Sequence, residues 1–227
     1  MIDDWNDKYF VGLKQVGEAY ISRPDYELFG KYCLKKEQGL KKLANQISIE
    51  FVDGLKQKPL AKQREIVIHL SELSNSHSVI NHHILGFIRD IVKNWLEEPN
   101  SIKSVQRFYR YCTWDEQERM LEMATNADPD DQFVLTVNVS KNLHELEWMT
   151  HHLTENIILG KLETAQRLLS DIETMMPKIS EGERKEQSKT RFDKMQKLFQ
   201  LWENYISKPR DVAFLDWAKH KDESFDW

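Results

Sequence analysis

The sequence has few of the residues that shape β-rich or disulfide-linked proteins. Its 227 residues include only 8 glycines, 6 prolines and 2 cysteines. So few glycines and prolines disfavour an all-β chain, which needs many tight turns. The two cysteines, Cys33 and Cys112, are too few for a disulfide framework and indicate reduced thiols, which are typical of the cytoplasm. We therefore expect a cytoplasmic protein whose core is held by packing alone.

Long apolar runs are also missing. The best candidate, VINHHILGFIRDIVKNWL (79–96), is interrupted by two His, an Arg, an Asp and a Lys, whereas a membrane-spanning helix needs about 20 mostly apolar residues. The acidic start MIDDWNDKYF lacks the apolar stretch of a signal peptide. The formal net charge of −5 argues against a protein devoted to nucleic acid. We expect neither a membrane segment nor a signal peptide.

The prolines mark gaps between segments that look helical. They stand at positions 24, 59, 99, 129, 177 and 209, outside the periodic segments, and a proline inside a helix costs about 3 kcal/mol. In the segment CLKKEQGLKKLANQISIEFVDGL, apolar residues recur at helical spacing: Leu34, Leu40, Leu43, Ile47, Phe51 and Leu55. Ser78 is placed to cap a strongly apolar helix that runs to Leu96, and Thr113 and Glu116 have the spacing of a capping box.

Two segments are less regular. Residues 132–140 (QFVLTVNVS) are rich in β-branched side chains, which favour strands. We predict a helix there because the sequence offers no second strand for pairing, and a strand remains the alternative. Residues 178–190 are dense in charge and nearly free of apolar side chains. They predict a solvated loop, which leads into a last long helix from about Phe192 to Ile206.

Together these segments predict an all-α protein built as an irregular array of antiparallel helical hairpins. We expect one domain over residues 1–227, with an alternative boundary near 99–113. Such arrays resemble the superhelices of tetratricopeptide and HEAT repeats, whose curved surfaces commonly bind other proteins.

One stretch resembles a known repeat more closely. Glu122, Ala124 and ADPDDQ (127–132) resemble the end of one tetratricopeptide unit and the start of the next. The wider arrangement of YCLKKEQGLKKLA, ADPDDQ and THHL…LG resembles an uncharacterised family of bacterial all-helical proteins, over residues 26–176. This resemblance implies a helical fold and a bacterial origin but no activity. Because no 34-residue self-similarity recurs, we expect an irregular array.

The candidate site is HELEWMTHHL, residues 144–153. On a helix, one side carries the aliphatic residues Val139, Leu143, Leu146, Met149, Leu153 and Ile157. The opposite side carries polar and aromatic residues that we predict to form a binding face: His144, Glu147, Trp148, His151 and His152. The tryptophan on this face suggests that a partner or another helix covers it. The alternative without a functional role is a solvent-exposed helix face with a local ion pair between Glu147 and His151.

The same face raises a metal-site alternative. The zinc-protease pattern fails because Trp148 stands four residues after His144. Glu147 and His151 could be two ligands, with His82 or His83 supplying a third from another helix. That set would point to a metal-dependent enzyme.

Other chemistry is weakly indicated. QRFYRYCTW (106–114) mixes arginines with aromatic residues and suggests single-stranded nucleic acid, but Phe108 and Tyr111 at helical spacing indicate inward packing instead. Cys112 could have a lowered pKa near Arg110, although a buried, inert thiol is favoured. We therefore expect a non-enzymatic protein-interaction module, an adaptor or a toxin-neutralising partner, with no cofactor and no catalytic residue. A metal-dependent enzyme and a nucleic-acid-binding protein are the alternatives.

Overall fold

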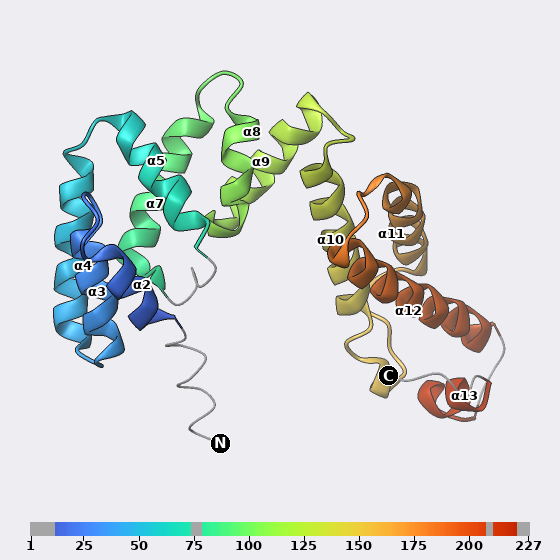
Figure 1. Cartoon of the computed structure of the whole chain (residues 1–227). Helices are drawn as coiled ribbons and strands as arrows, with labels where there is room; N and C mark the ends of the chain where they lie inside the picture. The colour runs from blue at the N-terminus through green and yellow to red at the C-terminus, as the bar shows by residue number, and fades with distance from the viewer. Residues whose placement is uncertain (1–11, 74–78, 208–210, 222–227) are drawn as a thin grey trace. The chain divides into compact units, whose positions relative to one another are not determined.

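The computed structural model describes residues 12–73, 79–207 and 211–221. Every regular element in these ranges is a helix, which confirms the all-α prediction (Figure 1). None of these helices is both long enough and apolar enough to cross a bilayer. Some sequence predictions concern residues outside these ranges. They are the first ten residues, Ser78, Pro209 and the acidic tail.

The chain divides into two compact units, Met1–Met120 and Leu121–Trp227. The division falls inside one helix, after the alternative boundary expected near 99–113. The single domain and its superhelical arrangement stay predictions.

The N-terminal unit is a set of short helices joined by tight connections. Its elements are α2 (Leu13–Tyr20), α3 (Glu27–Glu37), α4 (Lys41–Lys56), α5 (Leu60–Ser71), α7 (His82–Leu96), α8 (Ile102–Val105), the 3-10 helix η1 (Gln106–Tyr111) and the first part of α9 (Trp114–Ala127). Helix α3 packs between α2 and α4, and α7 contacts α4, α5 and η1. Several consecutive helices are therefore neighbours, as expected for hairpins, whereas α4 packs mainly on α3 and α7.

Side-chain caps explain where several helices begin. The Oδ1 atom of Asn81 accepts the Ile84 N–H at 3.1 Å and so caps α7. The predicted pairing at the start of α9 is present in part, because the Glu116 carboxylate accepts the Thr113 N–H at 2.8 Å. These bonds satisfy amide groups that have no partner inside the helix.

The prolines of the described residues lie between α-helices, as predicted. Pro59 occupies the N-cap of α5, and Pro177 lies in the 3-10 turn η3 (Met176–Lys178) after α11. The stripe from Leu34 to Leu55, however, crosses a break between α3 and α4. Gly39 adopts a left-handed φ of 73° there, and Leu40 and Leu43 are exposed as a result of the break.

Two glycines allow α2 and α3 to approach closely. A Cβ atom built on Gly30 would lie 2.4 Å from the Ile21 backbone nitrogen, and one on Gly17 would lie 2.6 Å from Leu34 Cγ. Both distances are far below van der Waals contact. The close approach of α2 to α3 therefore requires glycine at position 30, where backbone atoms block a side chain, whereas a side chain at position 17 would have to displace Leu34.

The C-terminal unit is built on one long helix. It contains the end of α9, α10 (Gln132–Met149), the 3-10 helix η2 (Leu153–Glu155), α11 (Leu162–Met175), η3, α12 (Glu183–Ile206) and α13 (Phe214–Lys221). Residues 132–140 are helical, which confirms the preferred prediction over a strand. Asp131 caps this helix by accepting the Phe133 N–H at 2.9 Å, and burial of Val134 and Val139 outweighs their strand propensity.

The predicted loop over residues 178–190 is wrong for most of its length, because α12 already begins at Glu183. Glu, Lys, Arg and Gln are good helix formers even without apolar neighbours. Local pairs support the first turns: Lys185 contacts Glu181 at 2.6 Å, and Gln187 donates to Glu183 at 2.9 Å. The first two turns of α12 are a solvated extension of the helix that packs from Phe192 onward.

Helix α13 is held to the unit by aromatic packing and by a hydrogen bond from the backbone of its first residue. Phe214 is fully buried, and its ring centroid lies 5.0 Å from that of Trp202 and 5.4 Å from that of Tyr205. The Phe214 N–H donates to Asn156 Oδ1 at 2.7 Å. The bond ties α13 to the turn after η2, so the two segments, which are distant in sequence, share one core.

We expect Gly30→Ala to lower the free energy of unfolding by about 1–3 kcal/mol, because the added methyl group meets backbone atoms that cannot move aside. Gly54→Ala, inside α4, is the matched control: its Cβ would meet nothing within 4 Å, so it should gain about 0.5–1 kcal/mol. Urea unfolding followed by circular dichroism measures both. Equal effects of the two substitutions would contradict the close packing of α2 on α3.

Candidate functional site

The candidate site is positioned by the aliphatic side of α10. Val139, Leu143, Leu146 and Met149 are essentially inaccessible to solvent and belong to a core cluster with residues of α11 and α12. This side of the helix was predicted from the sequence and is confirmed up to Met149. The prediction that Ile157 lies on the same side is wrong. Ile157 is 47% exposed, because the helix ends eight residues earlier.

Helix α10 ends at Met149, and Thr150 closes it. The Thr150 hydroxyl donates to the Glu147 carbonyl at 2.7 Å, and its N–H donates to the same oxygen at 3.1 Å. His151 and His152 therefore lie in the turn after the helix. The predicted binding face is thus divided, with His144, Glu147 and Trp148 on α10 and the other two histidines beyond its end.

Glu147 is bound by an arginine from α12. Arg191 donates through Nε and Nη2 to the two carboxylate oxygens, both at 2.8 Å. This bidentate hydrogen bonding from Arg191, opposed by partial burial, holds the pKa of Glu147 below its ordinary value of 4.5. The expected Glu147–His151 ion pair is wrong, because Arg191 takes that place and His151 is no longer on the helix.

The two histidines of the turn have different surroundings. His152 Nδ1 lies 2.8 Å from Glu155 Oε1, so this histidine is hydrogen-bonded within its own turn. His151 is exposed, and its ring centroid lies 5.8 Å from that of His152. The His152–Glu155 pair was not predicted, although its spacing of three residues could have indicated it.

The metal-site alternative finds no support in this geometry. Both oxygens of Glu147 already accept hydrogen bonds from Arg191. His82 and His83 lie in the first turn of α7, whereas Glu147 lies near the end of α10. Within the described ranges, no group of three or more His, Cys, Asp and Glu could hold a metal ion.

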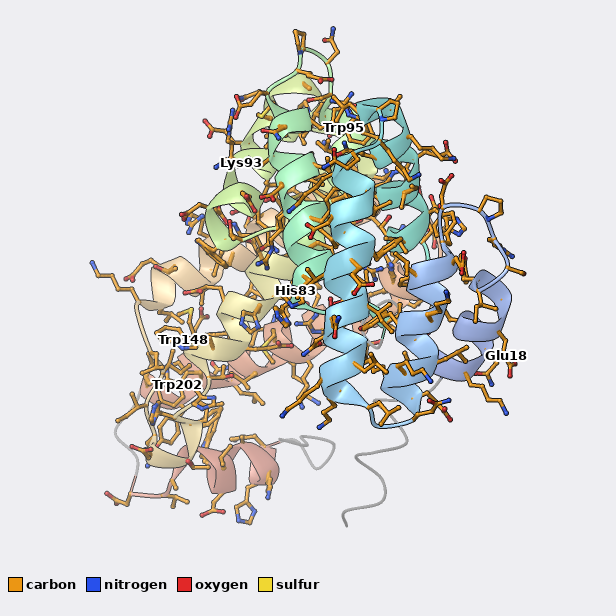
Figure 2. All side chains as sticks on the ribbon, turned by 90° about the vertical axis from the view of Figure 1, so that its left-hand side faces the viewer. Glu18, His83, Lys93, Trp95, Trp148 and Trp202 are labelled. Atoms are coloured by element: carbon orange, nitrogen blue, oxygen red, sulfur yellow. The ribbon has the colours of Figure 1, made fainter. Side chains whose placement is uncertain are left out.

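Trp148 is the most unusual residue of the face. Its side chain is 52% exposed, although tryptophan is a large and mostly apolar residue (Figure 2). His144 is also exposed one turn earlier on the same side of α10. The arrangement offers an indole and an imidazole to solvent on a helix whose opposite side is fixed in the core.

Several side chains of the basic and aromatic segment 106–114 pack within the N-terminal unit, whereas Trp114 at its end is 70% exposed. Phe108 and Tyr111 are buried, which confirms their inward packing. Arg107 pairs with Glu72 at 2.9 Å, and Arg110 donates to the Ser71 carbonyl at 3.0 Å. These contacts attach η1 to the end of α5. Some hydrogen-bond donors of both arginines are therefore already used within the protein.

Neither cysteine has the environment of a nucleophile. Cys33 and Cys112 are free and buried. Burial raises the pKa of the Cys33 thiol to about 12 and that of the Cys112 thiol to about 11. The lowered pKa considered for Cys112 is therefore wrong, because burial and the nearby Glu116 carboxylate raise the pKa more than Arg89 lowers it. Both thiols are protonated at neutral pH.

Comparisons with models of protein families, with curated proteins and with solved structures find no match to this chain.

We expect Arg191→Met to lower the free energy of unfolding at pH 7 by about 0.5–1 kcal/mol, since the pair is partly exposed and screened. Glu147 has a lowered pKa in the folded state, so its contribution is present above the unfolded pKa and is lost as the pH falls through the folded pKa. The difference between variant and wild type should therefore shrink as the pH falls below the ordinary carboxyl range. NMR titration should show the Glu147 pKa rising in the variant.

Arg167→Met is the control, because Arg167 forms only an exposed pair with Asp171 at 3.4 Å within α11. It should leave the Glu147 titration unchanged. A Glu147 pKa that is identical in wild type and Arg191→Met would contradict the assigned pair.

Proposed function

We propose that the protein is a non-enzymatic interaction module and that Trp148 is the centre of its contact with a partner protein. The observation that carries this proposal is the 52% exposure of Trp148 on a helix that is otherwise firmly packed. Tryptophan is enriched among the few residues that dominate binding energy at protein interfaces. An exposed indole surrounded by polar side chains is therefore better suited to binding than to folding.

The rigidity of α10 supports this role. Its aliphatic side is buried in the core, and Arg191 holds Glu147, the residue next to Trp148, in a bidentate pair. A contact residue on an ordered helix loses little conformational entropy when a partner binds. His144 and His151, both exposed, would add polar contacts around the indole.

The proposal extends to setting and partner class. Two buried, free thiols support a reducing compartment and hence a cytoplasmic location. An adaptor and a toxin-neutralising partner both use such a surface, and the resemblance to uncharacterised bacterial helical proteins supports a bacterial cell as the setting. No described residue favours the metal-dependent or nucleic-acid-binding alternatives specifically.

We expect Trp148→Ala to weaken binding of the native partner by about 2 kcal/mol or more, which is roughly 30-fold in Kd. The partner is first captured from the source cell with tagged wild-type protein and then purified. Its Kd is measured by calorimetry against wild type and variants. The thermal unfolding of Trp148→Ala should match that of wild type, because the side chain is more than half exposed.

Trp114→Ala is the matched control, since Trp114 is 70% exposed but lies at the start of α9. It should change the Kd by less than about twofold. Equal loss of affinity in the two variants, or unchanged affinity in Trp148→Ala, would overturn the proposal.

A further inference from the structure

Helix-interior glycines of this chain fall into two kinds. Gly17 and Gly30 have no room for a Cβ atom, because neighbouring atoms lie within 3 Å of its position. Gly54 and Gly86 lie inside α4 and α7, and a Cβ atom on either would meet nothing within 4 Å. Neither is among the glycines with positive φ. Packing and backbone conformation therefore explain the first pair but not the second.

Gly86 lines a cavity between α4 and α7. The cavity has a volume of about 250 Å³. Val52 and Phe87, both buried, form its apolar floor, and Ile49 is exposed beside it. Figure 2 shows His83 at the end of α7 that lies beside α4. Without a side chain at Gly86, a small molecule could approach the backbone of α7 directly.

The charges around the cavity favour a cation. Asp53 from α4 and Asp90 from α7 both line it, against a single lysine, Lys56. The Lys56 Nζ atom lies 3.9 Å from Asp53 Oδ1, which makes this a long ion pair, and the Lys56 side chain is largely exposed. No ion pair to Asp90 is present in the described part of the chain. His82 and His83 also line the cavity, and burial and the neighbouring His82 lower the pKa of His83, which disfavours a positive charge there.

The direction of the two helices does not change this polarity. Asn81, at the start of α7, donates to Ser48 Oγ at 2.8 Å, and Asp53 and Lys56 lie further along α4. The helices thus run parallel along the cavity, and the C-terminal end of α4 lies toward Asp90. The carbonyl groups of that end carry partial negative charge, but the first turn of α7, with His82 and His83, also lines the cavity and carries partial positive charge, so the two helix ends offset each other.

We propose that the cavity at Gly86 is a binding site for a small organic cation, whose charged group contacts Asp53 and Asp90 and whose short apolar chain packs on Val52 and Phe87. The site belongs to the N-terminal unit and does not depend on the surface around Trp148. The absence of a side chain at Gly86 leaves space for the apolar chain of the ligand. Ligand binding would therefore explain this glycine, which packing within the protein does not.

Agmatine is a suitable probe, because it joins a guanidinium and an ammonium group through a short alkyl chain. We expect it to shift the amide NMR signals of Gly86 and Asp53 saturably at neutral pH, with a Kd of about 1 mM or below. Asp90→Asn should weaken binding about tenfold, and added salt should weaken it further. Guanidinium chloride at equal concentration, which lacks the chain, should give no saturable shift.

Gly86→Leu should abolish the response, because its side chain occupies the cavity. Gly54→Leu is the matched control, since Gly54 lines a different cavity, next to α3, and it should bind agmatine as wild type does. Both substitutions replace a helix-interior glycine and should raise the unfolding temperature by about 2–4 °C, so lost binding cannot reflect misfolding. An absent response in wild type, or an equal response in wild type, Gly86→Leu and Asp90→Asn, would overturn the proposal.

Discussion

The burial of one side of α10 is the constraint on which the C-terminal unit depends. Val139, Leu143, Leu146 and Met149 join the core with α11 and α12, and each such side chain contributes about 1.5–3 kcal/mol when fully buried. Trp148 lies between Leu146 and Met149 in sequence and about half a turn away from the centre of that side. It cannot turn inward without removing those residues from the core. The exposure of Trp148 therefore follows from the packing of its neighbours.

Local periodicity predicted most of the helices and several of their buried sides, although Leu40 and Leu43 of one predicted stripe are exposed. Apolar residues three and four apart indicated that Leu143 and Leu146 face inward, and the missing second strand favoured a helix over residues 132–140. Such inferences succeed because side chains on one helix side share the same environment whatever partner covers it. The position of each helix relative to the others, by contrast, depends on contacts between residues that are distant in the sequence.

The errors lie where distant contacts or chain breaks decide the structure. Arg191 is 44 residues from Glu147, so no spacing rule could identify it as the partner. The end of α10 at Met149 divided a face that was predicted as continuous, and this removed the expected pair with His151. Residues 183–190 were predicted as a loop but are helical. A helix whose later turns pack in the core needs no apolar residue in its first turns.

Residues of one type acquire different roles from their surroundings. A glycine costs about 0.5–1 kcal/mol relative to alanine inside a helix, and this cost is offset at Gly30 by the close packing of α2 on α3. No contact within the chain offsets it at Gly86, where an added Cβ meets open space. The same reasoning applies to aromatic residues: Phe214 is buried and stabilises the unit, whereas Trp148 is exposed and contributes little to it. Residues whose cost is not recovered inside the fold are the ones for which contacts outside it must be sought. Trp148 and Gly86 meet that criterion in different units of the chain, and so do Trp114 and Gly54, which serve as their matched controls.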